Sequence, residues 1–194
     1  MLDVVEAAIA AGAPFELLGF LADGHADEQL LARRGQRVIG PVSRLGELDT
    51  HYVVAVGDGA VRRRVDELAT RFGREPATIV HPSVTFGGDV VLGPGCTLLA
   101  GVRVTNHVRL GRHVHVNQNA TVAHDCVLAD YVTVNPGANL SGNVELEEGV
   151  TIGTGATLIQ RVRVGAGTTV GAGAVVTDDL PAGVTAVGVP ARPR

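Results

Sequence analysis

Apolar residues recur at every sixth position over the second part of the chain. The series runs unbroken from Phe86 to Val176, and a second series of small or β-branched residues stands two places earlier, from Val84 to Ala174. A period of six fits neither the 3.6-residue period of an α-helix nor the alternation of a simple strand. It is the period of hexapeptide repeats, which form a parallel β-helix. The apolar positions are Phe86, Leu92, Leu98, Val104, Leu110, Val116, Val122, Leu128, Val134, Leu140, Leu146, Ile152, Leu158, Val164, Val170 and Val176.

Each hexad supplies one short strand, so three hexads make one triangular coil of about 18 residues. The apolar residue points inward from a flat face, and each coil hydrogen-bonds to the next and shares its core. Glycine and asparagine cluster between the strands, for example at Asn117, Asn119, Gly153 and Gly155, where the chain must turn. Residues separated by three hexads are therefore expected to stack on the same corner.

Residues 1–80 show a different pattern, in which helical and strand-like segments alternate. Apolar stripes predict helices over residues 2–11, 28–34 and 60–72, and apolar runs predict buried strands over residues 15–21 and 52–56. Alternating strands and helices favour a small parallel α/β sheet. We therefore divide the chain into an α/β unit, residues 1–80, and a β-helix, residues 81–194.

Composition narrows the classes of function. The net charge is −4, no basic run is longer than the three arginines at residues 62–64, and none of the 16 basic residues is a lysine. Nucleic acid is therefore not an expected partner, and Schiff-base or P-loop lysine chemistry is excluded. No apolar run reaches the ~18 residues of a membrane span, so no membrane insertion is expected. Two cysteines and the lack of a signal-peptide pattern favour a reducing cytoplasm.

Several strings along almost the whole chain resemble one family. They are GFLADG (19–24), VVAVGDGAVRR (53–63), ATIVHPSV (77–84), NATVAHDCVLADYVTVNPGANLSGNV (119–144) and VGVPAR (187–192). The sequence is similar to the hexapeptide-repeat sugar acetyltransferases, of the sialic acid O-acetyltransferase and UDP-4-amino-sugar N-acetyltransferase type. The resemblance implies a left-handed β-helix preceded by a truncated Rossmann-like α/β subdomain. It also implies acetyl-CoA as co-substrate, a nucleotide-linked amino sugar as acceptor, and a homotrimer with active sites between subunits.

Two features depart from the family pattern. Members usually begin with a strand and a Gly-rich GxGGHA-type loop, whereas this sequence starts at what corresponds to the following helix. Members also commonly carry histidine at the position of Thr133, which the resemblance implicates in contacting acetyl-CoA. Threonine can hydrogen-bond there but cannot act as a base.

His124 is the candidate general base. Acyl transfer from a thioester needs a base that accepts a proton from the attacking amine or hydroxyl, and imidazole titrates near neutral pH. The resemblance implies that Asp125 orients His124 or raises its basicity. Gly142 follows His124 by three hexads, so its backbone N–H is expected one coil away as an oxyanion donor.

The remaining candidate residues concern binding. Thr154 and Ala172 are again three hexads apart, and the resemblance places them, with Thr133 and Gly142, along the coenzyme A site. Asn117 matches a family asparagine close to the acceptor. Asp23, Gly57 and Asp58 follow the predicted strands of the α/β unit, where such sheets bind ligands. The candidates for acceptor binding are therefore Asp23, Gly57, Asp58 and Asn117.

Other functions fit parts of the pattern. A sugar O-acetyltransferase would use the same base. His81, His107, His113 and His115 raise the alternative of a metal-dependent hydratase of the γ-carbonic anhydrase type. A trimeric scaffold without catalysis is a further alternative. The HDC string favours base catalysis, so no metal is expected.

Overall fold

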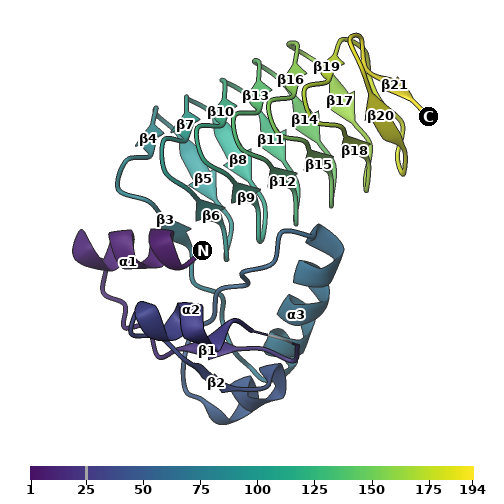
Figure 1. Cartoon of the computed structure of the whole chain (residues 1–194). Coiled ribbons are helices and arrows are strands. Elements are labelled where there is room, and N and C mark those ends of the chain that lie inside the picture. Colours follow the sequence, from purple (N-terminus) through teal and green to yellow (C-terminus); the bar gives the residue numbers. More distant parts are fainter. Residues whose placement is uncertain (25) are drawn as a thin grey trace.

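The computed structural model describes residues 1–24 and 26–194 and consists of a small α/β unit beside a long coil of short strands (Figure 1). In the α/β unit, β1 (Phe20–Leu21) pairs in parallel with β2 (Val38–Gly40). The helices of this unit are α1 (Leu2–Ala10), α2 (Glu28–Arg33), the 3-10 helix η1 (Val42–Glu47) and α3 (Gly59–Arg71). No helix in the described residues is both long and apolar enough to span a membrane.

The coil is a parallel β-helix with three faces, as the hexads predict, and it is left-handed, as the resemblance to the family implies. Face 1 contains β3 (Ile79–Val80), β6 (Thr97–Leu98), β9 (His115–Val116), β12 (Thr133–Val134), β15 (Thr151–Ile152), β18 (Thr169–Val170), β20 (Thr185–Val187) and β21 (Arg192–Pro193). Face 2 contains β4 (Thr85–Phe86), β7 (Arg103–Val104), β10 (Thr121–Val122), β13 (Asn139–Leu140), β16 (Thr157–Leu158) and β19 (Val175–Val176). Face 3 contains β5 (Val90–Leu92), β8 (Val108–Leu110), β11 (Val127–Leu128), β14 (Glu145–Leu146) and β17 (Arg163–Val164).

The register of the coil confirms the predicted stacking. Along faces 2 and 3, and on face 1 as far as β18, each strand pairs with the strand three hexads further on, for example Thr121 with Asn139. The fourteen apolar residues from Leu98 to Val176 are at most 3% exposed. Phe86 is 43% exposed because its coil is the first and has no preceding coil to cover it. The step from Thr169 to its partner Thr185 is two residues shorter than the three hexads that separate the other partners. The antiparallel pair β20–β21 closes the end of the coil.

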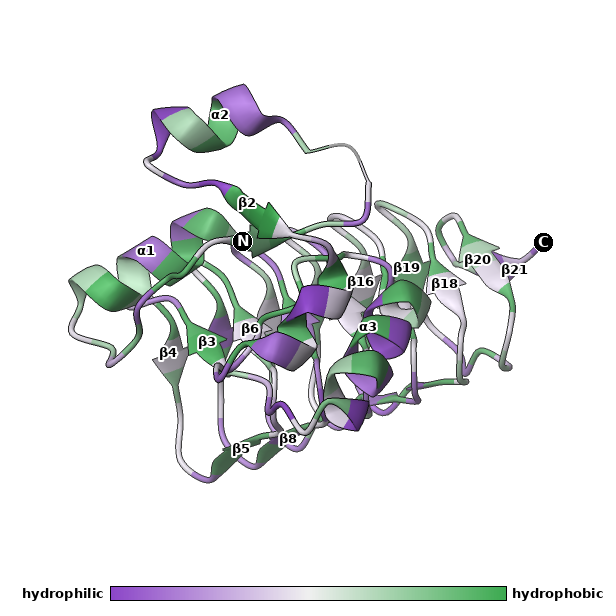
Figure 2. Cartoon of the chain, turned by 90° about the horizontal axis from the view of Figure 1, so that it is seen from below, coloured by the Kyte–Doolittle hydropathy of each residue, from purple (hydrophilic) through white to green (hydrophobic). Residues whose placement is uncertain are grey.

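The α/β unit covers the first part of face 1, where the outward-facing Thr97, His115 and Thr133 are buried, whereas Thr169 further along is exposed. Helix α1 lies against β3, and Figure 2 shows α1 and α3 on the same side of the coil. The start of α3 touches the coil directly, because a Cβ on Gly59 would lie 2.7 Å from the Tyr131 carbonyl oxygen. Glycine at this position therefore permits the close approach of α3 to the coil.

The predicted strands of the α/β unit were only partly right. Residues 15–21 form a strand only at Phe20–Leu21, and residues 52–56 form no strand beyond one bridge between Tyr52 and Pro76. The structure adds β2 and η1, which the apolar pattern did not indicate. Among the described residues, β1 pairs with β2 alone.

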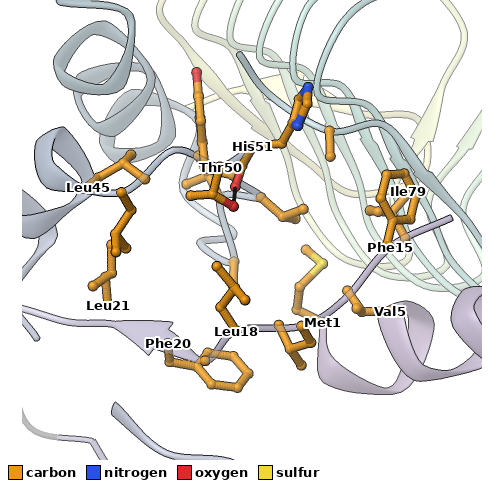
Figure 3. Close-up of a pocket in the computed structure, with 18 of the residues that line it drawn as sticks. Met1, Val5, Phe15, Leu18, Phe20, Leu21, Leu45, Thr50, His51 and Ile79 are labelled. Carbon is orange, nitrogen blue, oxygen red and sulfur yellow. Dashed lines mark hydrogen bonds between the residues drawn. The ribbon is translucent and has the colours of Figure 1, made fainter. Parts of the chain in front are cut away.

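An apolar cavity of about 600 Å³ lies between the two segments that were predicted as strands. It opens between the segment around Leu18 and Phe20 and the segment from Thr50 to Val56, as Figure 3 shows for the labelled residues. Both segments line this cavity, and they do not pair with each other. Phe15 and Leu18 in the first segment are 37% and 47% exposed.

Candidate active site

The predicted base and its neighbours stack on the corner between faces 2 and 3. Asn106, His124 and Gly142 follow one another on three successive coils, since the Asp125 N–H donates to Asn106 and the Asn143 N–H donates to His124. The His124 side chain is 54% exposed, so the imidazole points away from the core. A small molecule in solvent can therefore reach it.

Asp125 holds the His124 ring by its Nδ1 atom. The distance from His124 Nδ1 to Asp125 Oδ2 is 2.7 Å. Adjacent residues of a strand point to opposite sides, but Asp125 has φ +59° at the corner, and this allows both side chains to face outward. The hydrogen bond from His124 is the main cause of the lowered pKa of Asp125, which keeps the carboxylate charged. With Nδ1 held in this way, Nε2 is the nitrogen left for proton transfer.

Gly142 lies directly beside the imidazole. A Cβ at this position would come within 2.5 Å of His124 Cε1 and 2.6 Å of Nε2. Among the described residues, none accepts a hydrogen bond from the Gly142 N–H. The residue that lies against the His124 ring therefore has a backbone N–H without an acceptor in the described part of the chain.

A second group lies on the corner between faces 1 and 2. The Thr154 carbonyl accepts a hydrogen bond of 2.8 Å from Gly173 N–H, which stacks Ala172 on Thr154, and both residues are exposed. Asn117 lies on the same corner, and its Nδ2 donates to the Val134 carbonyl at 3.0 Å. Within one chain, this group lies on a different corner from His124.

The third group joins the coil to the α/β unit. Asp58 caps α3 by accepting a hydrogen bond of 2.9 Å from Val61 N–H, and this bond lowers the pKa of Asp58. The Thr133 hydroxyl donates to the Gly57 carbonyl at 3.1 Å and is buried. Asp23 lies apart from these residues and accepts a hydrogen bond from Val42 N–H at the start of η1.

Comparison with known proteins identifies the family. The profile of the bacterial transferase hexapeptide (six repeats) family matches residues 143–178. The acetyltransferase domain of PglB from Neisseria gonorrhoeae FA1090, solved in complex with acetyl coenzyme A, is 38% identical over 98% of this chain and 92% of that one, with a TM-score of 0.88. The chain belongs to the hexapeptide-repeat sugar acetyltransferases.

Further relatives of this acetyltransferase agree. PerB from Caulobacter crescentus, solved with CoA and GDP-perosamine, is 33% identical over 98% of this chain and 90% of that one, with a TM-score of 0.89. GDP-perosamine N-acetyltransferase from Escherichia coli O157:H7 is 39% identical over 85 residues, which are 44% of this chain and 38% of that protein. The match to the latter protein therefore spans well under two thirds of its length.

The acetyltransferase also contains a buried ionic cluster that the sequence patterns did not reveal. Asp66 on α3 accepts hydrogen bonds from Tyr52, from Tyr131 at 2.6 Å, and from Arg112 Nε and Nη2 at 2.7 and 2.6 Å. His113 Nε2 lies 2.9 Å from Asp66 Oδ1. We call these five residues the Asp66 cluster. The spacing of three hexads between His113 and Tyr131 was the one signal in the sequence, because it places both on the corner between faces 3 and 1.

The Asp66 cluster holds a charged carboxylate at the contact between the two parts of the chain. Burial raises the pKa of Asp66, but the hydrogen bonds from Arg112, Tyr131 and Tyr52 outweigh it and hold this pKa well below its usual value. Burial and the hydrogen bond to Asp66 raise the pKa of Tyr131 to about 12. Burial and the hydrogen bond to Asp66 also raise the pKa of Tyr52 above its usual value, so both tyrosines remain donors at physiological pH.

The histidines considered as metal ligands do not gather within one chain. Among the residues described, no group of three or more His, Cys, Asp or Glu side chains could hold a metal ion. His113 is buried and stacked between Tyr52 and Tyr131. Burial lowers the pKa of His115 to about 3, so this ring is neutral beneath the α/β unit.

Proposed function

We propose that this chain transfers the acetyl group of acetyl-CoA to the amine of a nucleotide-linked amino sugar. The observation that carries the proposal is the exposed His124, oriented by Asp125 and lying against Gly142, whose N–H has no acceptor among the described residues. Relatives solved with acetyl coenzyme A, or with CoA and GDP-perosamine, support the choice of substrates. Those relatives named as N-acetyltransferases favour an amine over a hydroxyl as acceptor.

The proposed reaction is a direct transfer between two bound substrates. The amine nitrogen attacks the thioester carbonyl carbon while His124 Nε2 accepts a proton from it. The negative charge that develops on the carbonyl oxygen is stabilised by the N–H of Gly142. The C–S bond then breaks, and coenzyme A leaves as a thiolate. No covalent intermediate with the enzyme forms.

We further propose that the active enzyme is a homotrimer with its active sites between subunits. In one chain, His124 and Gly142 lie on one corner of the coil, whereas Thr154, Ala172 and Asn117 lie on another. The β-helix of a neighbouring subunit would bring its Thr154, Ala172 and Asn117 next to His124 and Gly142 and enclose acetyl-CoA between the two groups. In this arrangement residues 1–80 bind the acceptor through Asp23, Gly57 and Asp58, and Asn117 of the coil contacts it as well. Residues 81–194 bind acetyl-CoA, with Thr133 near the contact between the two parts.

Release of free thiol tests the proposal. Purified protein would be mixed with acetyl-CoA and either GDP-perosamine or UDP-linked amino sugars, and the acetylated product analysed by mass spectrometry. Acceptor-dependent thiol release with an amide product is expected. Acetylation of sugar hydroxyls alone would mean an O-acetyltransferase. Failure to bind acetyl-CoA at all would favour a scaffold, and zinc-dependent hydration of CO₂ would favour a hydratase.

Substitution of Gly142 by alanine is expected to impair acetyl transfer. The added methyl group would overlap the His124 ring, so the imidazole must move away from the position that it now occupies. A displacement of about 1 Å at a reacting centre can cost ~100-fold in rate, so kcat/KM for acetyl-CoA should fall by about 10- to 100-fold. Initial rates at varied acetyl-CoA concentrations measure the effect.

Gly88→Ala is the matched control for this substitution. Gly88 lies on the same corner three coils earlier, and a Cβ there would meet no atom within 4 Å. Its kinetics should match those of the wild type. Equal kinetics for Gly142→Ala and the wild type would contradict the placement of Gly142 beside the reacting carbonyl.

A further inference from the structure

Arg62, in the first turn of α3, is fully buried although none of the described residues forms a salt bridge with it. Burial is the main cause that lowers the pKa of Arg62, to about 10, so the guanidinium is charged at neutral pH. A buried charge is costly unless hydrogen bonds compensate it. All the oxygens that accept hydrogen bonds from Arg62 are backbone carbonyls or a hydroxyl, none of which carries a full charge. They lie on the coil and on the loop before α3.

On the coil side, Arg62 binds the corner between faces 3 and 1. Its Nε donates to the His113 carbonyl at 2.9 Å, and its Nη2 donates to the Tyr131 carbonyl at 2.8 Å. Nη2 also lies 3.2 Å from the Val132 carbonyl and 3.0 Å from Thr133 Oγ1. One side chain thus contacts two successive coils.

On the other side, Arg62 binds the loop before α3. Its Nη1 donates to the carbonyls of Val56 and Gly57 at 3.0 and 3.1 Å. The Thr133 hydroxyl donates to the same Gly57 carbonyl. The loop that carries the acceptor candidates Gly57 and Asp58 is therefore fixed to the coil both by Arg62 directly and through Thr133.

We infer that Arg62 is a positioning residue for the acceptor, because its one guanidinium spans the Gly57 loop and the Thr133 segment of the coil. This inference rests on the proposed function. An acceptor held by the α/β unit must present its amine to a base on the coil, so the distance between the two parts has to be constant. The planar guanidinium, with donors in fixed directions, provides this constancy, whereas a lysine ammonium cannot reach both sides at once.

The test compares Arg62→Lys with the wild type. Lysine keeps the positive charge but lacks the planar guanidinium with its several donors. KM for the acceptor should therefore rise about tenfold, while the dissociation constant for acetyl-CoA changes less than twofold. Hydrogen exchange of the amides from Val56 to Asp58 should become faster. A purely structural role predicts a smaller folded fraction, with a lower apparent kcat and both substrate constants unchanged.

Arg64→Lys is the matched control, because Arg64 is an exposed arginine on the same helix. It should leave both substrate constants within twofold of the wild type. If Arg62→Lys does not fold, Thr133→Val tests the contact between the Gly57 loop and the coil in its place. This variant removes the hydroxyl that donates to Gly57 and leaves Arg62 unchanged. A rise in acceptor KM of about threefold is then expected.

An error in the proposed function and an error in the inference on Arg62 would give different results. If the wild type releases no thiol with any acceptor, the proposed function is wrong. If the wild type turns over and the folded Arg62→Lys variant, or Thr133→Val in its place, keeps the wild-type acceptor KM, the inference on Arg62 is wrong and the proposed function stands.

Discussion

Replacing His124 with alanine is expected to lower kcat at least ~100-fold, the scale of general acid–base catalysis. The imidazole is the ring that lies against Gly142, and alanine leaves no group at position 124 that can accept a proton from the amine. The side chain is half-exposed and does not contribute to the apolar core. The fold and thermal stability should therefore be unchanged, as checked by circular dichroism and thermal unfolding alongside the rate of thiol release.

His81→Ala provides the control for the loss of an imidazole. His81 lies on the corner between faces 1 and 2, where its Nδ1 hydrogen-bonds with Ser83. This variant should retain kcat within about twofold. A His124→Ala enzyme with the wild-type kcat would remove His124 from the mechanism.

Asp66→Asn is expected to lower the free energy of unfolding by about 3 kcal/mol, because removal of one partner from a buried ionic group leaves the others uncompensated. An amide offers a single acceptor oxygen and brings two donors of its own toward Arg112, His113 and the tyrosines. For a chain of this length the corresponding drop in Tm is about 10 °C. Thermal unfolding at pH 7 measures it, and Glu67→Gln, the exposed neighbour on α3, should change Tm by less than about 2 °C.

The pH dependence of stability gives a second measurement on the same cluster. The pKa of Asp66 in the folded protein is below its value of 3.8 in the unfolded chain, so the carboxylate stabilises the fold fully above about pH 4. That contribution is lost as the pH falls through the folded pKa. The difference in Tm between wild type and Asp66→Asn should therefore narrow below pH 4. A constant difference, or none at neutral pH, would contradict the role given to Asp66.

The coil was predictable in detail because its signal is repeated along the chain. Each hexad reports the same geometry, and the period of three hexads alone placed Gly142 beside His124 and Ala172 on Thr154. The outward direction of Asp125 depends on its positive φ at the corner, which adjacent positions in a sequence do not reveal. The spacing also could not assign the two stacks to one active site, since they lie on different corners of a single chain.

The α/β unit and its contact with the coil were less predictable. Whether an apolar run such as residues 52–56 becomes a strand depends on a partner strand elsewhere in the fold, and the local pattern carries no information on that partner. Arg62 and Asp66 lie four residues apart on α3, the spacing of an ordinary exposed ion pair. Their burial results from packing of α3 onto the coil, as does the burial of Thr133.

The three-hexad register of the coil limits how its length can change. An insertion or deletion of one hexad beyond Gly142 would keep every later strand pattern but turn the following chain by one face, moving Thr154 and Ala172 to a different corner. A change of three hexads restores all corners and alters only the height of the stack. Homologous coils should therefore differ in length by whole turns, with changes of one or two hexads confined to the end after β19.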